Sequence, residues 1–223
     1  MGLKVSCEQA TVVRFADARS MVADLHAAAT LLPFDDVTPI ETLDETTSEL
    51  DRLFASHGTE RFVAPAIEAV WFCAYAEGSE TTWIGLASRP SVAPDRDGVE
   101  VATGLGDLCT WQWCCKTQYA SLPQHGGTDN FLRVHTSLIA LADHARSIGL
   151  EVDVTDDSNY WELRDPELLV AEVERWNRRM AAFAGWLTDR VGDELGKPLA
   201  PIMTHPAFER LEAEGREELG LAT

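Results

Sequence analysis

The chain has 223 residues, of which 37 are Asp or Glu and 18 are Lys or Arg, so its formal net charge is −19. Nucleic-acid phosphates are bound by clustered Lys and Arg, and we therefore expect no direct nucleic-acid binding. A strongly acidic surface instead attracts basic proteins, metals or cationic ligands. The longest apolar run, residues 69–76, is far shorter than the roughly 20 residues of a membrane-spanning helix, which predicts no membrane partner.

The amino-terminal residues and the cysteines indicate the compartment. Residues 1–6 contain no apolar stretch of signal-peptide length, so we expect a cytoplasmic protein. The five cysteines are an odd number without paired spacings, which favours reduced thiols over a disulfide framework. The abundance of Arg and Ala is typical of a GC-rich bacterial genome.

The length predicts one domain over residues 1–223, because a chain of this size can bury roughly 70% of its unfolded surface without disulfides or metal. Within it we distinguish an amino-terminal part with a strand, a helix and an acidic segment (1–60), a sheet (61–120) and a mainly helical part (121–223).

In the amino-terminal part, alternation of apolar and polar residues around 12–15 predicts a strand. A helix over 16–32, ended by Pro33, is predicted by an apolar stripe at helical spacing, namely Met21, Leu25, Ala28 and Leu32. Residues 35–51 then contain seven acids and no basic residue. We expect this acidic segment to be solvated and suited to contact with a partner.

The middle of the chain predicts antiparallel sheet. Residues 69–76 and 82–88 are rich in aromatic and β-branched residues and flank Glu77-Gly78-Ser79-Glu80, a hairpin signal. Further strands are predicted over 99–103 and 109–119.

The last hundred residues predict helices over 129–148 and 166–191, a short strand over 151–154 and a terminal helix over 206–215. Together these elements predict an α+β fold, in which an antiparallel sheet of four to six strands carries the long carboxyl-terminal helices on its aromatic face.

Strand 109–119 is the most informative segment, because side chains alternate between the two faces of a strand. One face carries Cys109, Trp111, Trp113, Cys115, Thr117 and Tyr119, which we expect to be core. The other face carries a polar row, which is either the wet face of the sheet or the wall of a pocket: Thr110, Gln112, Cys114, Lys116 and Gln118.

Within the polar row, Cys114 lies one strand repeat from Lys116, and a nearby cation favours the nucleophilic thiolate. A base for such a thiol would come from His125 or His135. Cys114 and His125 are therefore our candidate catalytic residues, with the alternative that both histidines are structural.

The loop before helix 129–148 suggests a weak anion site, because free amides at a helix amino terminus attract negative charge. The alternative is a simple turn and cap. The candidate ligand-binding residues of this loop and the polar row are Gln112, Lys116, Gln118, Gly126, Gly127, Thr128 and Arg133.

The residues that could bind a metal do not follow the spacing of a metal-binding motif. Cys109, Cys114 and Cys115 do not match a zinc pairing, and the acids of residues 153–162 lack the order of an EF-hand loop. We expect neither a metal nor another cofactor.

Two functions follow as hypotheses. The first is an acidic cytoplasmic binding protein of the inhibitor or immunity type, which associates with a basic protein through residues 35–51. The alternative is a small-molecule enzyme or ligand binder for an anionic group, with its pocket on the polar face of strand 109–119 and, in the case of an enzyme, a cysteine nucleophile.

Overall fold

The structure is a computed structural model that describes residues 2–43, 64, 66–95, 97–191 and 200–221. Along these residues the elements are β1 (Lys4–Thr11), α1 (Phe15–Leu31), β2 (Asp36–Val37), β3 (Glu41–Leu43), β4 (Glu68–Tyr75), β5 (Thr82–Ser88), β6 (Val92–Pro94), β7 (Glu100–Ala102), β8 (Cys109–Lys116), the short 3-10 helices η1 (Gln118–Ser121) and η2 (Pro123–His125), α3 (Gly127–Ser147), β9 (Glu151–Asp156), α4 (Tyr160–Leu163), α5 (Pro166–Val191), η4 (Pro201–Thr204) and α6 (Phe208–Leu219).

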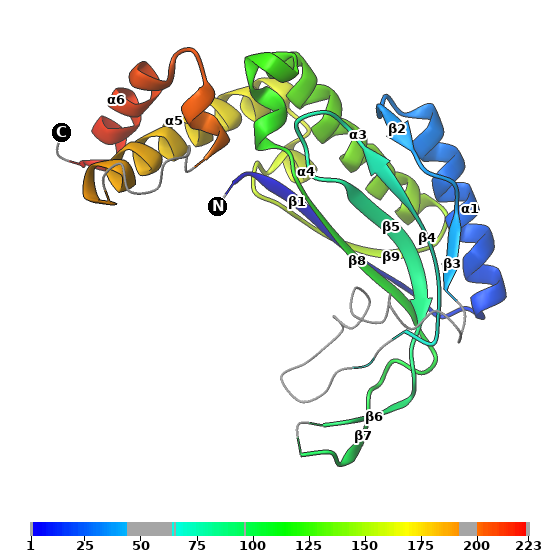
Figure 1. The fold of residues 1–223 in the computed structure, drawn as a ribbon. Coiled ribbons are helices and arrows are strands. Elements are labelled where there is room, and N and C mark those ends of the chain that lie inside the picture. The colour runs from blue at the N-terminus through cyan, green and yellow to red at the C-terminus, as the bar shows by residue number, and fades with distance from the viewer. Residues whose placement is uncertain (1, 44–63, 65, 96, 192–199, 222–223) are drawn as a thin grey trace.

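In the described residues seven strands form one antiparallel sheet with the order β2-β4-β5-β8-β1-β9, and β3 also pairs with β4 (Figure 1). Strands β6 and β7 form a separate hairpin that extends beyond the end of the sheet. The predicted α+β class, with helices packed on an antiparallel sheet, is confirmed.

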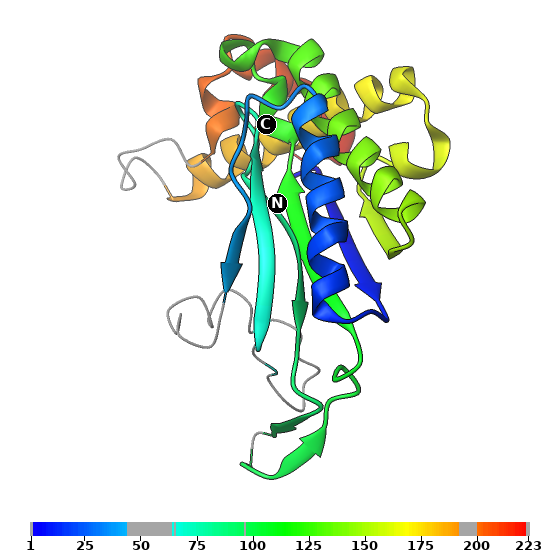
Figure 2. The same ribbon diagram turned by 90° about the vertical axis from the view of Figure 1, so that its right-hand side faces the viewer.

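Helices α1 and α3 pack on the same face of the sheet (Figures 1 and 2). Their buried side chains, among them Leu25 of α1 and Leu138 of α3, meet the inward residues of the strands in the main core. The apolar pattern of α3 was therefore predicted correctly, whereas the buried face of α1 is Ala18, Val22, Leu25 and Ala29 and shares only Leu25 with the predicted stripe. Helix α1, rather than α5, is the second helix on the sheet.

Helix α5 leaves the sheet after its first turns. Leu169 and Val173 belong to the main core, whereas Met180 and Ala184 form a second core with Ile202 of η4 and neighbouring residues. The second half of α5 therefore packs with η4 and α6 away from the sheet, as Figure 1 shows.

Strand β1 corrects the prediction of a strand around 12–15. It spans Lys4–Thr11 and lies inside the sheet between β8 and β9. Its inward face includes Gln9, an amide in a core position, whose Nε2 donates to the Gly85 carbonyl oxygen at 2.9 Å. This long-range bond satisfies the buried amide, and a strand with such a residue is hard to recognise from local pattern.

Strand β8 ends at Lys116, earlier than the predicted residue 119, and η1 follows. Its inward face is as predicted up to Cys115: Cys109, Trp111, Trp113 and Cys115 are buried. The chain turns because the Thr117 and Gln118 amides both donate to the Leu3 carbonyl oxygen and the Ala120 amide donates to Thr117.

No described helix is long and apolar enough to cross a membrane. All five cysteines are free thiols in this structure.

Candidate functional site

On the sheet face opposite α1 and α3, the strands β8, β1 and β9 each present exposed polar side chains. These are Glu8, Gln112, Cys114, Lys116, Glu151, Asp153 and Thr155. We call this the open face.

Three residues of the predicted polar row, Gln112, Cys114 and Lys116, lie on the open face. The other two are not exposed. Thr110 is buried and accepts a hydrogen bond from Arg89 Nε at 3.3 Å. Gln118 is fully buried in η1, where its Oε1 accepts from the Leu3 amide and its Nε2 donates to Asn177 Oδ1 at 3.0 Å. The prediction that Gln118 is exposed was wrong because the strand ends before it.

The candidate catalytic pair is not brought together by any described contact. Cys114 is exposed, and no described bond or ion pair joins it to His125 or His135. His125 Nδ1 lies 3.2 Å from Glu77 Oε1. The neighbouring cation is also engaged, because Lys116 Nζ donates to Glu80 Oε1 at 2.8 Å, a bond that raises the Lys116 pKa.

The glycine loop before α3 uses its amides internally. Gly126 and Gly127 have φ values of 102° and 70°, which non-glycine residues rarely adopt. Their amides donate to the carbonyl oxygens of Pro123 and Leu122 at 3.2 and 3.1 Å. Thr128 lies in the first turn of α3. Two amides of the predicted anion site are therefore already bonded within the loop.

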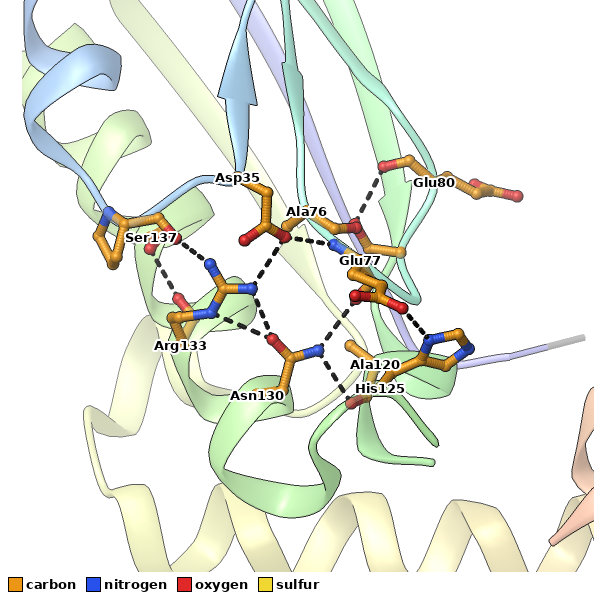
Figure 3. A network of polar contacts seen from close by, with 11 residues as sticks. Asp35, Ala76, Glu77, Glu80, Ala120, His125, Asn130, Arg133 and Ser137 are labelled. Atoms are coloured by element: carbon orange, nitrogen blue, oxygen red, sulfur yellow. Dashed lines mark hydrogen bonds and ion pairs between the residues drawn. The ribbon is translucent and has the colours of Figure 1, made fainter. Parts of the chain in front are cut away.

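Arg133 is the centre of a polar network that joins four segments (Figure 3). Its Nη2 donates to Asp35 Oδ2 at 3.0 Å and to Asn130 Oδ1 at 2.6 Å, and its Nη1 donates to the Pro33 carbonyl oxygen. The hydrogen bond from Arg133 lowers the pKa of the Asp35 carboxyl. Asp35 belongs to the predicted acidic segment, but here it is occupied by a cation of the same chain.

Asn130 extends this network to the β4–β5 hairpin. Its Nδ2 donates to the carbonyl oxygens of Glu77 and Ala120 at 2.9 and 3.2 Å, and the Glu77 amide donates to Asp35 Oδ2 at 2.7 Å (Figure 3). The network therefore fixes the hairpin, η1 and the start of β2 on α3. It gives Arg133 a structural role.

A second buried network surrounds His135, whose side chain is fully buried, as is that of Asp156. Thr117 Oγ1 lies 3.1 Å from His135 Nδ1, and Asp156 Oδ2 lies 3.2 Å from His135 Nε2. The Asp156 carboxylate also accepts bonds from the Ser158 amide and hydroxyl and from the Trp161 amide. This network ties β9 and α4 to α3, and no solvent reaches its titratable groups.

A hollow of about 260 Å³ lies on the open face between β1 and β9. It is lined by Glu8, Gln9, Ala10, Glu151, Val152 and Asp153. We call it the acidic hollow. Another hollow, of about 540 Å³, lies beside the start of α1 and the end of the β7–β8 loop. Neither is lined by Cys114 or His125.

The register of β1 and β9 gathers like charges in the acidic hollow. Glu8 is directly opposite Asp153, and Ala10 is opposite Glu151. Carboxylates directly opposite each other on neighbouring strands repel and destabilise the pair. Burial raises the pKa of the Cys7 thiol to about 12, and the charges of Asp153 and Glu8 contribute in the same direction.

These carboxylates lack a cationic partner in the described part of the chain. Glu8 accepts a hydrogen bond from Gln112 Nε2 at 3.1 Å. Arg146 reaches β9, but its Nη2 donates to the Val152 carbonyl oxygen at 3.4 Å, and it forms no described ion pair. Among the described residues no group of three or more His, Cys, Asp or Glu side chains is arranged to hold a metal ion.

The sequence prediction missed the acidic hollow. The alternation Glu151-Val152-Asp153 does place two acids on one face of a strand. Their meeting with Glu8, however, depends on pairing between strands more than 140 residues apart in the chain, and local pattern does not determine this register.

Comparison of this chain with family models, with curated proteins and with solved structures finds no match.

Proposed function

We propose that the protein binds a basic partner protein through the acidic hollow on its open face. The proposal rests mainly on three carboxylates in one hollow. Glu8 lies directly opposite Asp153, Glu151 lines the same hollow, and none of the three forms an ion pair with the described residues. A lysine or arginine side chain of the partner would enter a hollow of about 260 Å³ and offset the repulsion among the three carboxylates.

The charge of the whole chain supports the same partner. At a net charge of −19, the long-range field accelerates encounters with basic molecules and repels acidic ones, and salt weakens both effects. The proposal places the contact on the open face, whereas the sequence had suggested residues 35–51. Of that segment, residues 44–51 lie outside the described residues, and Asp35 is paired with Arg133.

The alternative function, binding of an anionic ligand, is not favoured, because the two candidate basic residues already form ion pairs within the chain. Lys116 is bonded to Glu80 and Arg133 to Asp35. A cytoplasmic location remains part of the proposal and is supported by the five free thiols, which suit a reducing compartment.

The test measures binding of a fluorescent lysine-rich peptide by anisotropy at low and high salt. The hollow variant carries Glu8→Gln, Glu151→Gln and Asp153→Asn. If each lost ion pair is worth about 0.5 kcal/mol, the three together weaken binding about tenfold at low salt.

The matched control is a triple variant with the same loss of charge, Glu162→Gln, Glu174→Gln and Glu209→Gln. These carboxylates are exposed and have no ion pair with described residues. We expect less than about a twofold effect in this control, because only the diffuse field changes. Equal weakening in the two variants would mean that the peptide responds to overall charge, and the acidic hollow would lose its role.

A further inference from the structure

Strand β9 forms one margin of the sheet in the described residues, where it pairs with β1 alone (Figure 2). The unpaired side of an edge strand offers amides and carbonyls to which another strand can bond. Because the acidic hollow lies on β9 and β1, its partner would contact this edge.

The pairing pattern shows which backbone groups face the edge. The Asp157 amide donates to the Lys4 carbonyl oxygen at 3.1 Å. Bonding alternates along antiparallel strands, so Asp153 and Thr155 also bond to β1, whereas Val152 and Val154 direct their amides and carbonyls away from it. The side-chain bond from Arg146 to the Val152 carbonyl oxygen agrees with this direction.

The side chains of the edge determine what an added strand must carry. Glu151 and Asp153 are both exposed on the open face and lie two residues apart, which is roughly 6.6 to 6.8 Å along a strand. Side chains on neighbouring strands have their Cβ atoms about 4.5–5.5 Å apart. Lysine or arginine at every second position of an added strand would therefore lie beside these carboxylates.

We propose that the partner adds an extended segment to the free edge of β9, with basic residues at alternate positions. This inference rests on the proposed function and specifies its partner: main-chain bonds to Val152 and Val154 provide the docking, and alternate basic side chains provide the selectivity. Arg146 must release the Val152 carbonyl oxygen when the segment binds.

The first experiment uses a fluorescent peptide that alternates lysine and threonine. Two N-methylated versions carry the methyl groups on the lysine amides or on the threonine amides. In an added strand only one of these two sets of amides faces β9. We expect one version to bind at least about tenfold more weakly than the parent and the other to retain its affinity. A peptide of the same composition with its lysines in one block should also bind more weakly.

The second experiment changes the protein at the edge. Val152→Pro removes an amide that faces away from β1, so the pairing with β1 is retained and the substitution suits an edge position. Val152→Ala is the matched control for loss of the side chain. We expect the proline variant to bind the alternating peptide at least fivefold more weakly than the alanine variant, with both variants shown to be folded by thermal melting.

The outcomes separate this inference from the proposed function. If no lysine-rich peptide binds, the proposed function fails and the inference with it. If the peptide binds through the acidic hollow, but neither methylation pattern nor Val152→Pro changes its affinity, edge addition is overturned and the proposed function stands. If sedimentation shows a dimer that Val152→Pro dissociates, the edge is occupied by a second copy, and the basic partner segment is overturned.

Discussion

The buried carboxylate of Asp156 offers the sharpest test of how this fold is held together. The change Asp156→Asn keeps the shape of the side chain but replaces one of its two carboxylate oxygens, which together receive bonds from His135, Ser158 and Trp161, by an amide nitrogen that cannot accept. Removing one member of a buried pair costs about 3–5 kcal/mol, because the remaining groups stay buried without a partner.

That cost corresponds to a lower melting temperature. For a domain of this size each kcal/mol lowers Tm by about 2–4 °C, so we expect a decrease of roughly 6–20 °C. The assay is urea unfolding followed by tryptophan fluorescence, together with a thermal melt. The matched control is Asp153→Asn on the same strand, because that side chain is exposed on the opposite face. There we expect no loss, and a gain of about 0.2–1 kcal/mol from relief of the repulsion with Glu8.

The effect of Asp156→Asn should depend on pH in one direction. Burial alone would raise the pKa of the Asp156 carboxyl, but the hydrogen bond and charge of His135 and the bonds from Ser158 lower it below its ordinary value. A carboxyl with a lowered folded-state pKa stabilises the fold above its unfolded-state pKa, and this contribution is lost as the pH falls through the folded-state value. The difference between wild type and variant should thus be largest above about pH 5 and shrink below about pH 4. A loss under 1 kcal/mol at pH 7, or a difference unchanged down to pH 3, would refute the role given to this network.

Three further experiments, one by labelling and two by substitution, test other parts of the structure. Thiol labelling of the native protein at pH 8 should modify Cys114 alone, because the other four cysteines are buried and burial raises the pKa of Cys115 to about 11; mass spectrometry showing a second labelled thiol would contradict the buried positions. Gly215→Ala should lower the free energy of unfolding by about 1–3 kcal/mol and speed amide exchange in α6 alone, because an added Cβ would overlap the Arg178 carbonyl oxygen of α5. Unchanged exchange would mean that α6 does not depend on this contact. Arg133→Ala should lower the free energy of unfolding by about 1–3 kcal/mol, because Asp35 and Asn130 lose their shared donor. Arg133→Lys keeps the charge but should recover only part of this loss. Urea unfolding of both variants therefore separates the contribution of the hydrogen bonds from that of the positive charge.

Elements set by local periodicity were predicted well from the sequence. The apolar stripe of α3 and the inward aromatic face of β8 depend only on residues within each element, and their periods of 3.6 and 2 are visible in the chain. The stripe of α5 holds for Leu169, Val173 and Met180, which are buried, but not for Phe183, which is exposed. The hairpin of β4 and β5 was found in the same way, because its turn and strands are contiguous.

Features that depend on distant partners were not predictable in this way. Strand β1 has Gln9 on its inward face, where its amide nitrogen donates to the distant Gly85 carbonyl oxygen. The end of β8 is set by the Leu3 carbonyl, and the exposure predicted for Gln118 failed for that reason. The acidic hollow needs the register of β1 against β9. In each case the deciding contact joins residues that no local window contains.

The junction between α5 and the rest of the molecule is polar at its centre. Asn177 accepts from Gln118 and donates to Ser121 Oγ at 2.9 Å, and all three residues are buried. Each residue of slippage turns an α-helix by about 100°, which would carry the Asn177 amide away from both partners and leave it and Gln118 Nε2 buried without these bonds. These two bonds therefore fix the rotation of α5 and, with it, the position of α6. An apolar replacement such as Asn177→Leu should leave α5 and α6 attached to the rest of the molecule but allow them more than one orientation.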